Sequence, residues 1–156
     1  MVHWVVGDSP DLTFGPVLRT EPRMVAVARD HPLAGRDSVT VEDLGDYLMC
    51  RVAGVDEEIL RAFIPPTTPS GRTISFFPQP IRTHVEWISL VARGHAIHPT
   101  VPSIKSLVGD SAIVLRPLTG LPPMRLGLIW CTAHENARVR ALARVAADLE
   151  SSSDQG

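Results

Sequence analysis

The stretch from Arg19 to Leu44 constrains the fold more than any other part of the chain, because local structure must change several times within it. The apolar run Met24–Val27 predicts a buried strand. The sequence Asp-His-Pro-Leu at 30–33 ends this strand, because proline lacks the amide hydrogen that a strand ladder needs. Thr40, followed three residues later by Asp43, is typical of a helix start. The stretch therefore predicts a strand, a corner, a loop and a short helix.

Strand-like and helix-like segments alternate through most of the remaining chain. We expect strands at 2–6, 24–27, 47–52, 73–77, 95–98, 112–116 and 124–131. We expect helices at 40–46, 56–63, 83–94, 101–107 and 136–149. Residues 11–22 contain Pro16 and Pro22 and are expected to form an irregular link. Alternation of this kind favours an α/β fold, in which helices cover both faces of a sheet.

The composition limits the classes of function that we expect of this protein. A chain of 156 residues with 44% apolar residues is long enough for one ordinary domain. Its 15 basic residues are scattered among 17 acidic ones, so we expect no nucleic-acid binding by this chain alone. The amino terminus has no basic region followed by an apolar segment, and no apolar run approaches the roughly 18 residues of a membrane span. We therefore expect a cytoplasmic protein with no membrane contact.

The cysteines and histidines do not predict a metal or cofactor site. Cys50 and Cys131 lie far apart in apolar runs and are interpreted as buried reduced thiols. His84, His95 and His98 are close in sequence, but residues three apart on a strand point to opposite faces. We therefore expect no metal site and no cofactor.

A hydrolase alternative depends on Gly7-Asp8-Ser9, which follows a predicted strand. This tripeptide is similar to the nucleophile block of GDS-type esterases, which also need a distant Asp-x-x-His to supply the base. No Asp-x-x-His occurs in the chain, so a turn that ends the strand is the favoured interpretation. The alternative would be a small esterase that uses Ser9 with His31 or His134, and it remains open.

Three segments together carry a family resemblance. The strand, the Asp-His-Pro-Leu-Ala corner and the Val-x-x-x-Asp-Leu helix of Met24–Leu44 resemble a segment of the effector-binding domain of LysR-type bacterial transcriptional regulators. Ile88–Pro99 is similar to the family's helix-turn-strand "LVAAGLGIALLP", and Arg116–Trp130 resembles its returning strand. The terminal helix matches the closing helix of the family. The resemblance covers nearly the whole chain and is carried by patterns, without a catalytic signature.

The resemblance implies a two-lobed domain similar to periplasmic binding proteins, preceded in the family by a winged helix-turn-helix and a linker. On this basis we expect a complete second lobe at 21–130, remnants of the first lobe at 1–20 and 131–150, and a disordered tail at 151–156. The same alignment pairs the strand 24–27 with its counterpart 124–130 at the boundary between lobes. The helix-turn-helix and the early part of the first lobe have no counterpart in the sequence.

The implied function is that of a small-molecule sensor and not of an enzyme. In the family, an effector is held between the lobes, and lobe closure changes the geometry of the oligomer. A third interpretation is an interaction module that no longer binds ligand. An incomplete first lobe would expose a sheet edge at Val2–Val6, so we expect self-association into a homo-oligomer through this region.

The expected effector site follows from the physics of helix amino termini, which attract anions. Effectors of the family often carry a carboxylate, so we expect an anionic ligand at Thr83 and His84. His98 and Thr100 are predicted hydrogen-bonding partners across the cleft, and Gly54 is predicted to permit close approach of the backbone.

Overall fold

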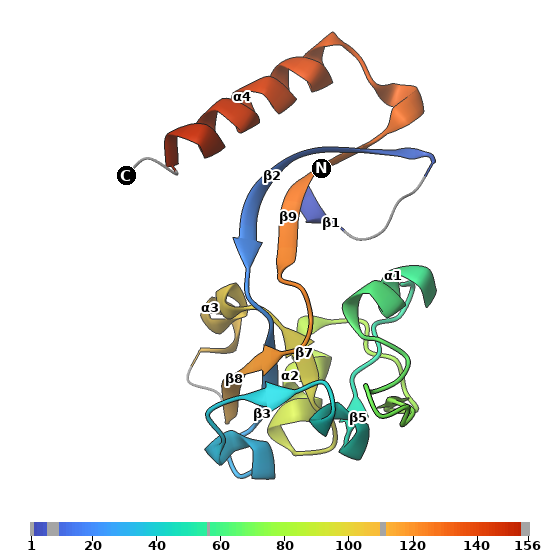
Figure 1. The fold of residues 1–156 in the computed structure, drawn as a ribbon, viewed down its shortest axis with the longest axis vertical. Helices are drawn as coiled ribbons and strands as arrows, with labels where there is room; N and C mark the ends of the chain where they lie inside the picture. Colours follow the sequence, from blue (N-terminus) through green and yellow to red (C-terminus); the bar gives the residue numbers. More distant parts are fainter. Residues whose placement is uncertain (1, 6–9, 56, 110–111, 154–156) are drawn as a thin grey trace. The chain divides into compact units, whose positions relative to one another are not determined.

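The computed structural model describes residues 2–5, 10–55, 57–109 and 112–153. The chain divides into two compact units (Figure 1). The central unit comprises residues 22–122, and the terminal unit comprises residues 1–21 together with 123–156. This division places residues 123–130 in the terminal unit, whereas the expected second lobe, 21–130, included them.

The central unit is organised around β3 (Met24–Ala28), which confirms the strand predicted there. β3 pairs antiparallel with both β7 (His98–Thr100) and β8 (Ile113–Thr119). β4 (Val39–Thr40) pairs parallel with β8, so the strand order is β4-β8-β3-β7. Because β3 lies between two partners, its backbone hydrogen-bonding groups are satisfied on both sides.

The Asp-His-Pro-Leu sequence forms the predicted corner. The imidazole Nδ1 of His31 accepts a hydrogen bond from the Leu33 amide at 3.2 Å, and the 3₁₀ helix η1 (Pro32–Gly35) follows. Proline suits the first position of this turn because its φ angle is already close to the helical value. The corner therefore owes its shape to local chemistry that is visible in the sequence.

The helix predicted at 40–46 is wrong in type, although its start signal is present. Thr40 belongs to β4, and its amide donates to the Asp43 carboxylate at 2.8 Å. The Asp43 amide donates back to the Thr40 hydroxyl at 3.3 Å. Only the 3₁₀ helix η2 (Asp43–Asp46) follows, because the chain is extended again at Tyr47 on its way into the next strand. The capping signal at Thr40 is therefore followed by one turn of 3₁₀ helix and not by an α-helix.

The remaining elements of the central unit are short. The 2-residue strands β5 (Leu48–Met49) and β6 (Ser75–Phe76) pair in parallel, in place of the longer strands predicted at 47–52 and 73–77. The helices are α1 (Glu57–Phe63), α2 (His84–Ala92), the 3₁₀ helix η3 (Pro102–Ile104) and α3 (Lys105–Val108).

Two clusters of buried apolar side chains form the core of the central unit. Val25 and Val27 of β3 belong to the first cluster, with Leu44 and Met49. Ala26, between them in the sequence, belongs to the second cluster, with residues of α2. Alternate residues of a strand point to opposite faces, so the two clusters occupy the two faces of the sheet. In this unit the expectation of a sheet covered on both sides is confirmed.

The terminal unit contains a three-stranded antiparallel sheet with the order β1-β9-β2. Its strands are β1 (Val2–Val5), β2 (Leu12–Glu21) and β9 (Met124–Cys131), followed by the 3₁₀ helix η4 (Thr132–His134) and α4 (Ala137–Ser153). The predicted pairing of 24–27 with 124–130 is wrong, because β9 pairs with β1 and β2. The irregular link predicted at 11–22 is also wrong, because these residues form β2.

Pro16 explains why β2 was missed. Phe14 lies opposite Ile129 and Val17 lies opposite Gly127, so Gly15 and Pro16 together face the single residue Leu128 in a bulge. Proline is tolerated at a bulge and in an edge strand because its missing amide hydrogen interrupts no ladder there. A proline that indicated a link therefore lies within a strand.

α4 begins where the sequence predicts, with the Asn136 side chain accepting from the Arg138 amide at 3.0 Å. The helix continues through Ser153, beyond the predicted end at Leu149. The tail expected at 151–156 therefore begins inside α4, and residues 154–156 lie outside the described residues. Across the described ranges, no helix combines the length and the hydrophobicity needed to cross a membrane.

Candidate functional site

The amino terminus of α2 is capped as the sequence predicts. The Thr83 hydroxyl accepts a hydrogen bond from the Glu86 amide at 3.2 Å. The Glu86 carboxylate in turn accepts from the Arg82 amide at 2.6 Å. These two bonds satisfy amide hydrogens that a helix start would otherwise leave without partners. The capping also fixes the direction in which the first turn of α2 presents its side chains.

Three aromatic side chains meet beside this helix start, and we call them the histidine–tryptophan cluster: His84, Trp87 and His98. The Trp87 ring is only 3% exposed, and its indole Nε1 donates to Nδ1 of His84 at 3.3 Å. Trp87 also stacks on His98, with 4.8 Å between the ring centroids and 26° between the ring planes. The Trp87 indole therefore contacts His84 of its own helix and His98 of β7, and the stacking on His98 links α2 to β7.

His98 is the chemically unusual member of the cluster. Its ring Nδ1 is buried and has no hydrogen-bond partner among the described residues. Burial, and secondarily the nearby His84, lowers the pKa of His98 to about 4. The ring is consequently neutral at neutral pH. A buried polar nitrogen without a partner is uncommon in folded proteins, and it marks a group with hydrogen-bonding capacity to spare.

His84 presents a defined tautomer to solvent. Because its Nδ1 accepts the hydrogen bond from Trp87, the proton of the neutral ring resides on Nε2. The side chain is exposed. His84 therefore offers a ring N–H donor close to the positive end of the α2 dipole, and this combination suits an acceptor such as a carboxylate oxygen.

The other two predicted site residues, Gly54 and Thr100, are not members of the histidine–tryptophan cluster. Gly54 is exposed and has a φ of +74°, so glycine is favoured there by backbone conformation alone. Thr100 is half-buried in β7, opposite Met24. Within the described ranges, neither residue hydrogen-bonds to the three rings or stacks on them. His84 and His98 are thus brought together, with Thr83 adjacent, and the assignment of Gly54 and Thr100 to the site stays a prediction.

The strand predicted at 95–98 is wrong, and with it the argument that His95 and His98 point to opposite faces. β7 begins only at His98 and runs through Pro99, which an edge strand tolerates. His95 is exposed and precedes the strand. Where the structure describes side chains, no three histidine, cysteine or carboxylate groups come close enough to hold a metal ion.

Sequence reasoning missed Trp87, which joins the two histidines. The signal was available in the spacing: Trp87 lies three residues after His84 and four before Val91, on one side of a helix whose start was correctly predicted. The stacking on His98 could not be found in this way, because it joins residues that are distant along the chain.

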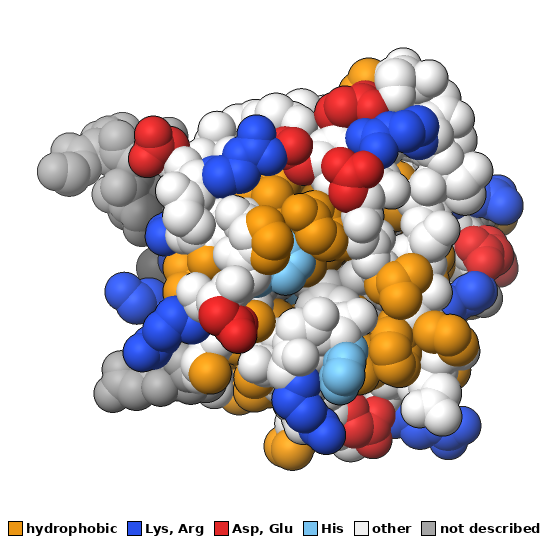
Figure 2. Space-filling view, turned by 90° about the horizontal axis from the view of Figure 1, so that it is seen from below, with side chains coloured by type: hydrophobic (Ala, Val, Ile, Leu, Met, Phe, Trp, Pro, Cys, Tyr) orange, Lys and Arg blue, Asp and Glu red, His pale blue; other side chains and the backbone are white. Residues whose placement is uncertain are grey.

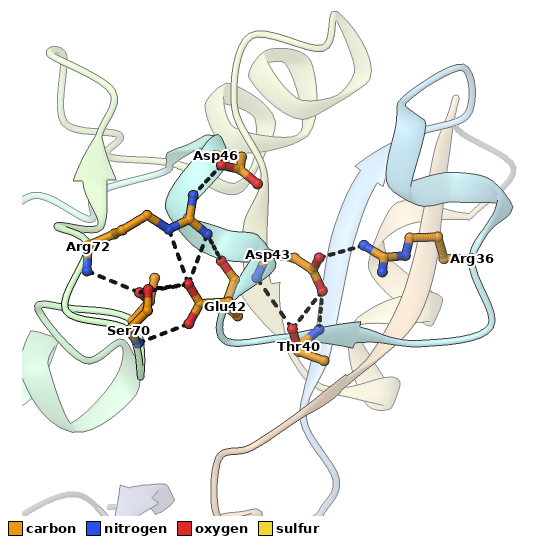
Figure 3. A network of polar contacts seen from close by, with 8 residues as sticks. Arg36, Thr40, Glu42, Asp43, Asp46, Ser70 and Arg72 are labelled. Atoms are coloured by element: carbon orange, nitrogen blue, oxygen red, sulfur yellow. Dashed lines mark hydrogen bonds and ion pairs between the residues drawn. The ribbon is translucent and has the colours of Figure 1, made fainter.

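A second polar cluster fastens the loop 65–73 to η2 (Figure 3). The Arg72 guanidinium contacts the Glu42 carboxylate at 3.1 Å and also pairs with Asp46. The Ser70 hydroxyl bonds to Glu42 as well, and this bond is the largest cause of the lowered pKa of Glu42. The carboxylates of Glu42 and Asp46 already bind protein groups, so we interpret this cluster as a structural one that holds the loop against η2.

Of the nucleophile candidates, the structure describes the two cysteines. Burial raises the pKa of Cys50 to about 12, so its thiol stays protonated at neutral pH. Cys50 and Cys131 are both free thiols, and Cys131 is half-buried. Gly7-Asp8-Ser9, on which the esterase alternative depends, lies outside the described residues.

On the face of the molecule drawn in Figure 2, charged side chains of one sign do not gather in one region. Lys and Arg side chains there are interspersed with Asp and Glu around apolar ones. Mixed charge of this kind agrees with the net charge of −2. It does not form the continuous basic stripe that a phosphate backbone attracts.

Comparisons with known proteins find matches by structure but none by sequence. No protein-family model matches the chain, and no curated protein matches its sequence. Solved structures do match. The regulatory domain of MetR from N. meningitidis, a LysR family regulator, aligns with a TM-score of 0.69 at 17% identity, over 94% of this chain and 70% of that one.

Two further matches are domains solved with small molecules. The effector-binding domain of QuiR in complex with shikimate aligns with a TM-score of 0.67 at 19% identity, over 96% of this chain and 68% of that one. The effector-binding domain of BenM with its effector benzoate aligns with a TM-score of 0.68 at 18% identity, over 98% and 69%. These neighbours are regulatory domains and not enzymes. The predicted resemblance is confirmed: the chain has the mixed α/β fold of the effector-binding domains of LysR-family regulators, of which it spans about 70%.

Proposed function

We propose that this chain is a small-molecule sensing domain of a LysR-type transcriptional regulator and acts in the bacterial cytoplasm. The fold supports a regulatory role, and the neighbours solved with shikimate and benzoate support a small molecule as the ligand. In this proposal the central unit corresponds to the second lobe, and the terminal unit carries the parts of the first lobe that the chain contains.

The observation that carries the proposal is the unpaired, buried Nδ1 of His98 beside a capped helix start. Trp87 holds the ring of His98 in place by stacking, so the nitrogen is positioned before any ligand arrives. A preorganised group loses little conformational entropy when it binds. A ligand that hydrogen-bonds to His98 would also supply the partner that the described residues do not provide.

The ligand that fits best is a small carboxylate. Thr83 can donate from its hydroxyl, His84 from Nε2, and the α2 dipole is positive at this end. The Glu86 carboxylate lies in the same first turn and repels a second negative charge. The site therefore favours an effector with a single carboxylate. Gly54 and Thr100 belong to the proposed site only if the ligand extends toward them.

The proposed mechanism is a shift between two conformational states. An effector that binds one arrangement of the lobes more tightly moves the equilibrium toward it, in proportion to the difference in affinity. Lobe closure of this kind would alter how copies of the regulator associate. Binding of the effector would thus change the geometry of the oligomer, and other parts of the regulator would contact the DNA.

The test is binding of benzoate and shikimate to the full chain, measured by calorimetry and by thermal stabilisation at pH 7.5, with benzamide as an uncharged control. We expect the carboxylates, and not benzamide, to raise the melting temperature. His84→Gln and His98→Gln should each weaken binding about tenfold or more, the usual effect of losing a hydrogen bond to a charged group.

His95→Gln is the matched control, because it removes an exposed histidine of the same region that has no place in the cluster. It should leave the affinity unchanged. Equal binding of benzamide and benzoate would contradict the anion preference. Equal affinity of the wild type and a folded His98→Gln variant would contradict the proposed site.

A further inference from the structure

Trp87 is a buried aromatic residue that carries one polar group. Its side chain is 3% exposed, and its indole Nε1–H can only donate a hydrogen bond. Buried tryptophans normally satisfy this donor with a protein acceptor. Here the acceptor is Nδ1 of His84, at 3.3 Å. The contact therefore joins a buried group, which can only donate, to an exposed histidine that a ligand can reach.

The fold holds both partners of this hydrogen bond in place. His84 is the first residue of α2, directly after the Thr83 cap, and Trp87 lies one turn further along the same side of the helix. The indole stacks on His98 of β7 and packs with Val91 in the second core cluster. Because these contacts enclose the indole, its N–H is directed at His84 before any ligand arrives.

The partner of a neutral histidine decides which ring nitrogen carries the proton. An imidazole without such a partner could present either a donor or an acceptor to a ligand. We propose that Trp87 is a positioning residue: without touching the effector, it keeps His84 as a hydrogen-bond donor at Nε2, so that the site selects acceptors such as carboxylate oxygens. The ligand in this proposal rests on the proposed function, whereas the tautomer of His84 can be measured without a ligand.

The competing explanation is that Trp87 only fills the core, and two replacements separate the two roles. Trp87→Phe removes the N–H and keeps an aromatic ring to stack on His98. Replacement of Trp87 by 3-benzothienylalanine puts sulfur in place of the N–H and also keeps the size of the indole. The second replacement tests the donor even if Trp87→Phe does not fold. If Trp87 only fills the core, this second replacement should change nothing at His84.

The first test is nitrogen-15 NMR of the histidine rings in the full chain at pH 7.5 without ligand, with His84→Gln to assign the signals. In the neutral ring of the wild type we expect the proton of His84 on Nε2, and in both replacements of Trp87 a mixture of the two tautomers. The second test is calorimetric titration with benzoate. Both replacements should weaken its binding roughly threefold or more, the order of magnitude of one hydrogen bond.

Trp130→Phe is the matched control, because it also removes an indole N–H that donates to a side chain, here the Glu135 carboxylate at 3.1 Å. It should change neither the tautomer of His84 nor the affinity for benzoate. A wild-type His84 that carries its proton on Nδ1 would overturn the proposal. So would an unchanged tautomer, or an unchanged affinity for benzoate, in the folded replacements of Trp87. The expected tautomers in a chain that binds no benzoate would support the positioning of His84 and contradict the proposed function alone.

Discussion

The central and terminal units bury their apolar side chains with unequal completeness. In the central unit, β3 supplies Val25 and Val27 to one core cluster and Ala26 to another, so both faces of its sheet are covered. In the terminal unit, three strands and one helix leave Leu142 and Val145 exposed. The comparison teaches that the central unit covers both faces of its sheet, although it too exposes large aliphatic side chains, of which Val85 is 76% exposed.

The largest expected difference between the units comes from shortening one leucine in each. Leu44 of the central unit is 0% exposed, and Leu44→Ala should lower the free energy of unfolding by about 2 to 5 kcal/mol. Leu142→Ala should change it by less than about 0.5 kcal/mol, because an exposed side chain leaves no cavity. Urea unfolding of the full chain measures both. A large loss for Leu142→Ala would show that the Leu142 side chain contributes to the core of the terminal unit, and the two leucines would then no longer differ.

The second expected effect is a pH dependence that arises in the central unit. The pKa of His98 falls from 6.5 when unfolded to about 4 when folded, so the unfolded chain binds more protons between these values. Stability is therefore complete above pH 6.5 and declines as the pH falls toward 4. Integrated over this window, the loss is at most about 3 kcal/mol.

Unfolding free energies at several pH values, compared between the wild type and His98→Gln, isolate this contribution. His31 also has a pKa lowered by burial and adds a decline of the same sign to both proteins. The difference between the two curves should thus shrink as the pH falls. Parallel curves would mean that the His98 ring is accessible to protons in the folded state, and the buried character of the cluster would then be wrong.

The third and smallest expected effect concerns the sheet of the terminal unit. A methyl group on Gly15 would lie 2.5 Å from Trp130 Cζ3, so the indole packs directly on the glycine. Gly15→Ala should destabilise the chain by about 1 to 3 kcal/mol through overpacking. Hydrogen exchange should rise in β2 and β9 more than in β3. Gly35→Ala is the control, because a methyl group there meets nothing within 4 Å. Equal exchange in all three strands would indicate that the two units unfold together.

Local chemistry was the predictable part of the fold and of the candidate site. The corner at His31 and the caps at Thr83 and Asn136 follow from hydrogen bonds between residues that are close in sequence. The apolar run of β3 is confirmed for a similar reason, because a strand buried on both faces must be apolar throughout. The prediction of Thr83 and His84 at a helix start depends on the same local signals, whereas His98 was predicted as a partner across the cleft.

The errors occurred where a local signal competed with distant partners. Pro16 indicated a link, but β9 supplied a ladder in which a bulge accommodates the proline. The signal at Thr40 indicated a helix, but pairing of β5 with β6 pulled the chain into an extended form after one turn. Gly54 and Thr100 make no hydrogen bond to the rings and do not stack on them within the described ranges, so their place in the site stays a prediction.

By itself, the sequence determined the α/β class, the corner, the helix starts and the resemblance to an effector-binding domain, because each depends on interactions over a few residues. Only the tertiary structure decided that β9 pairs with β1 and β2, that Trp87 stacks on His98, and that Leu142 faces outward. The reason is physical. These contacts join segments that are far apart along the chain, and their free energy is gained only when the whole unit has packed.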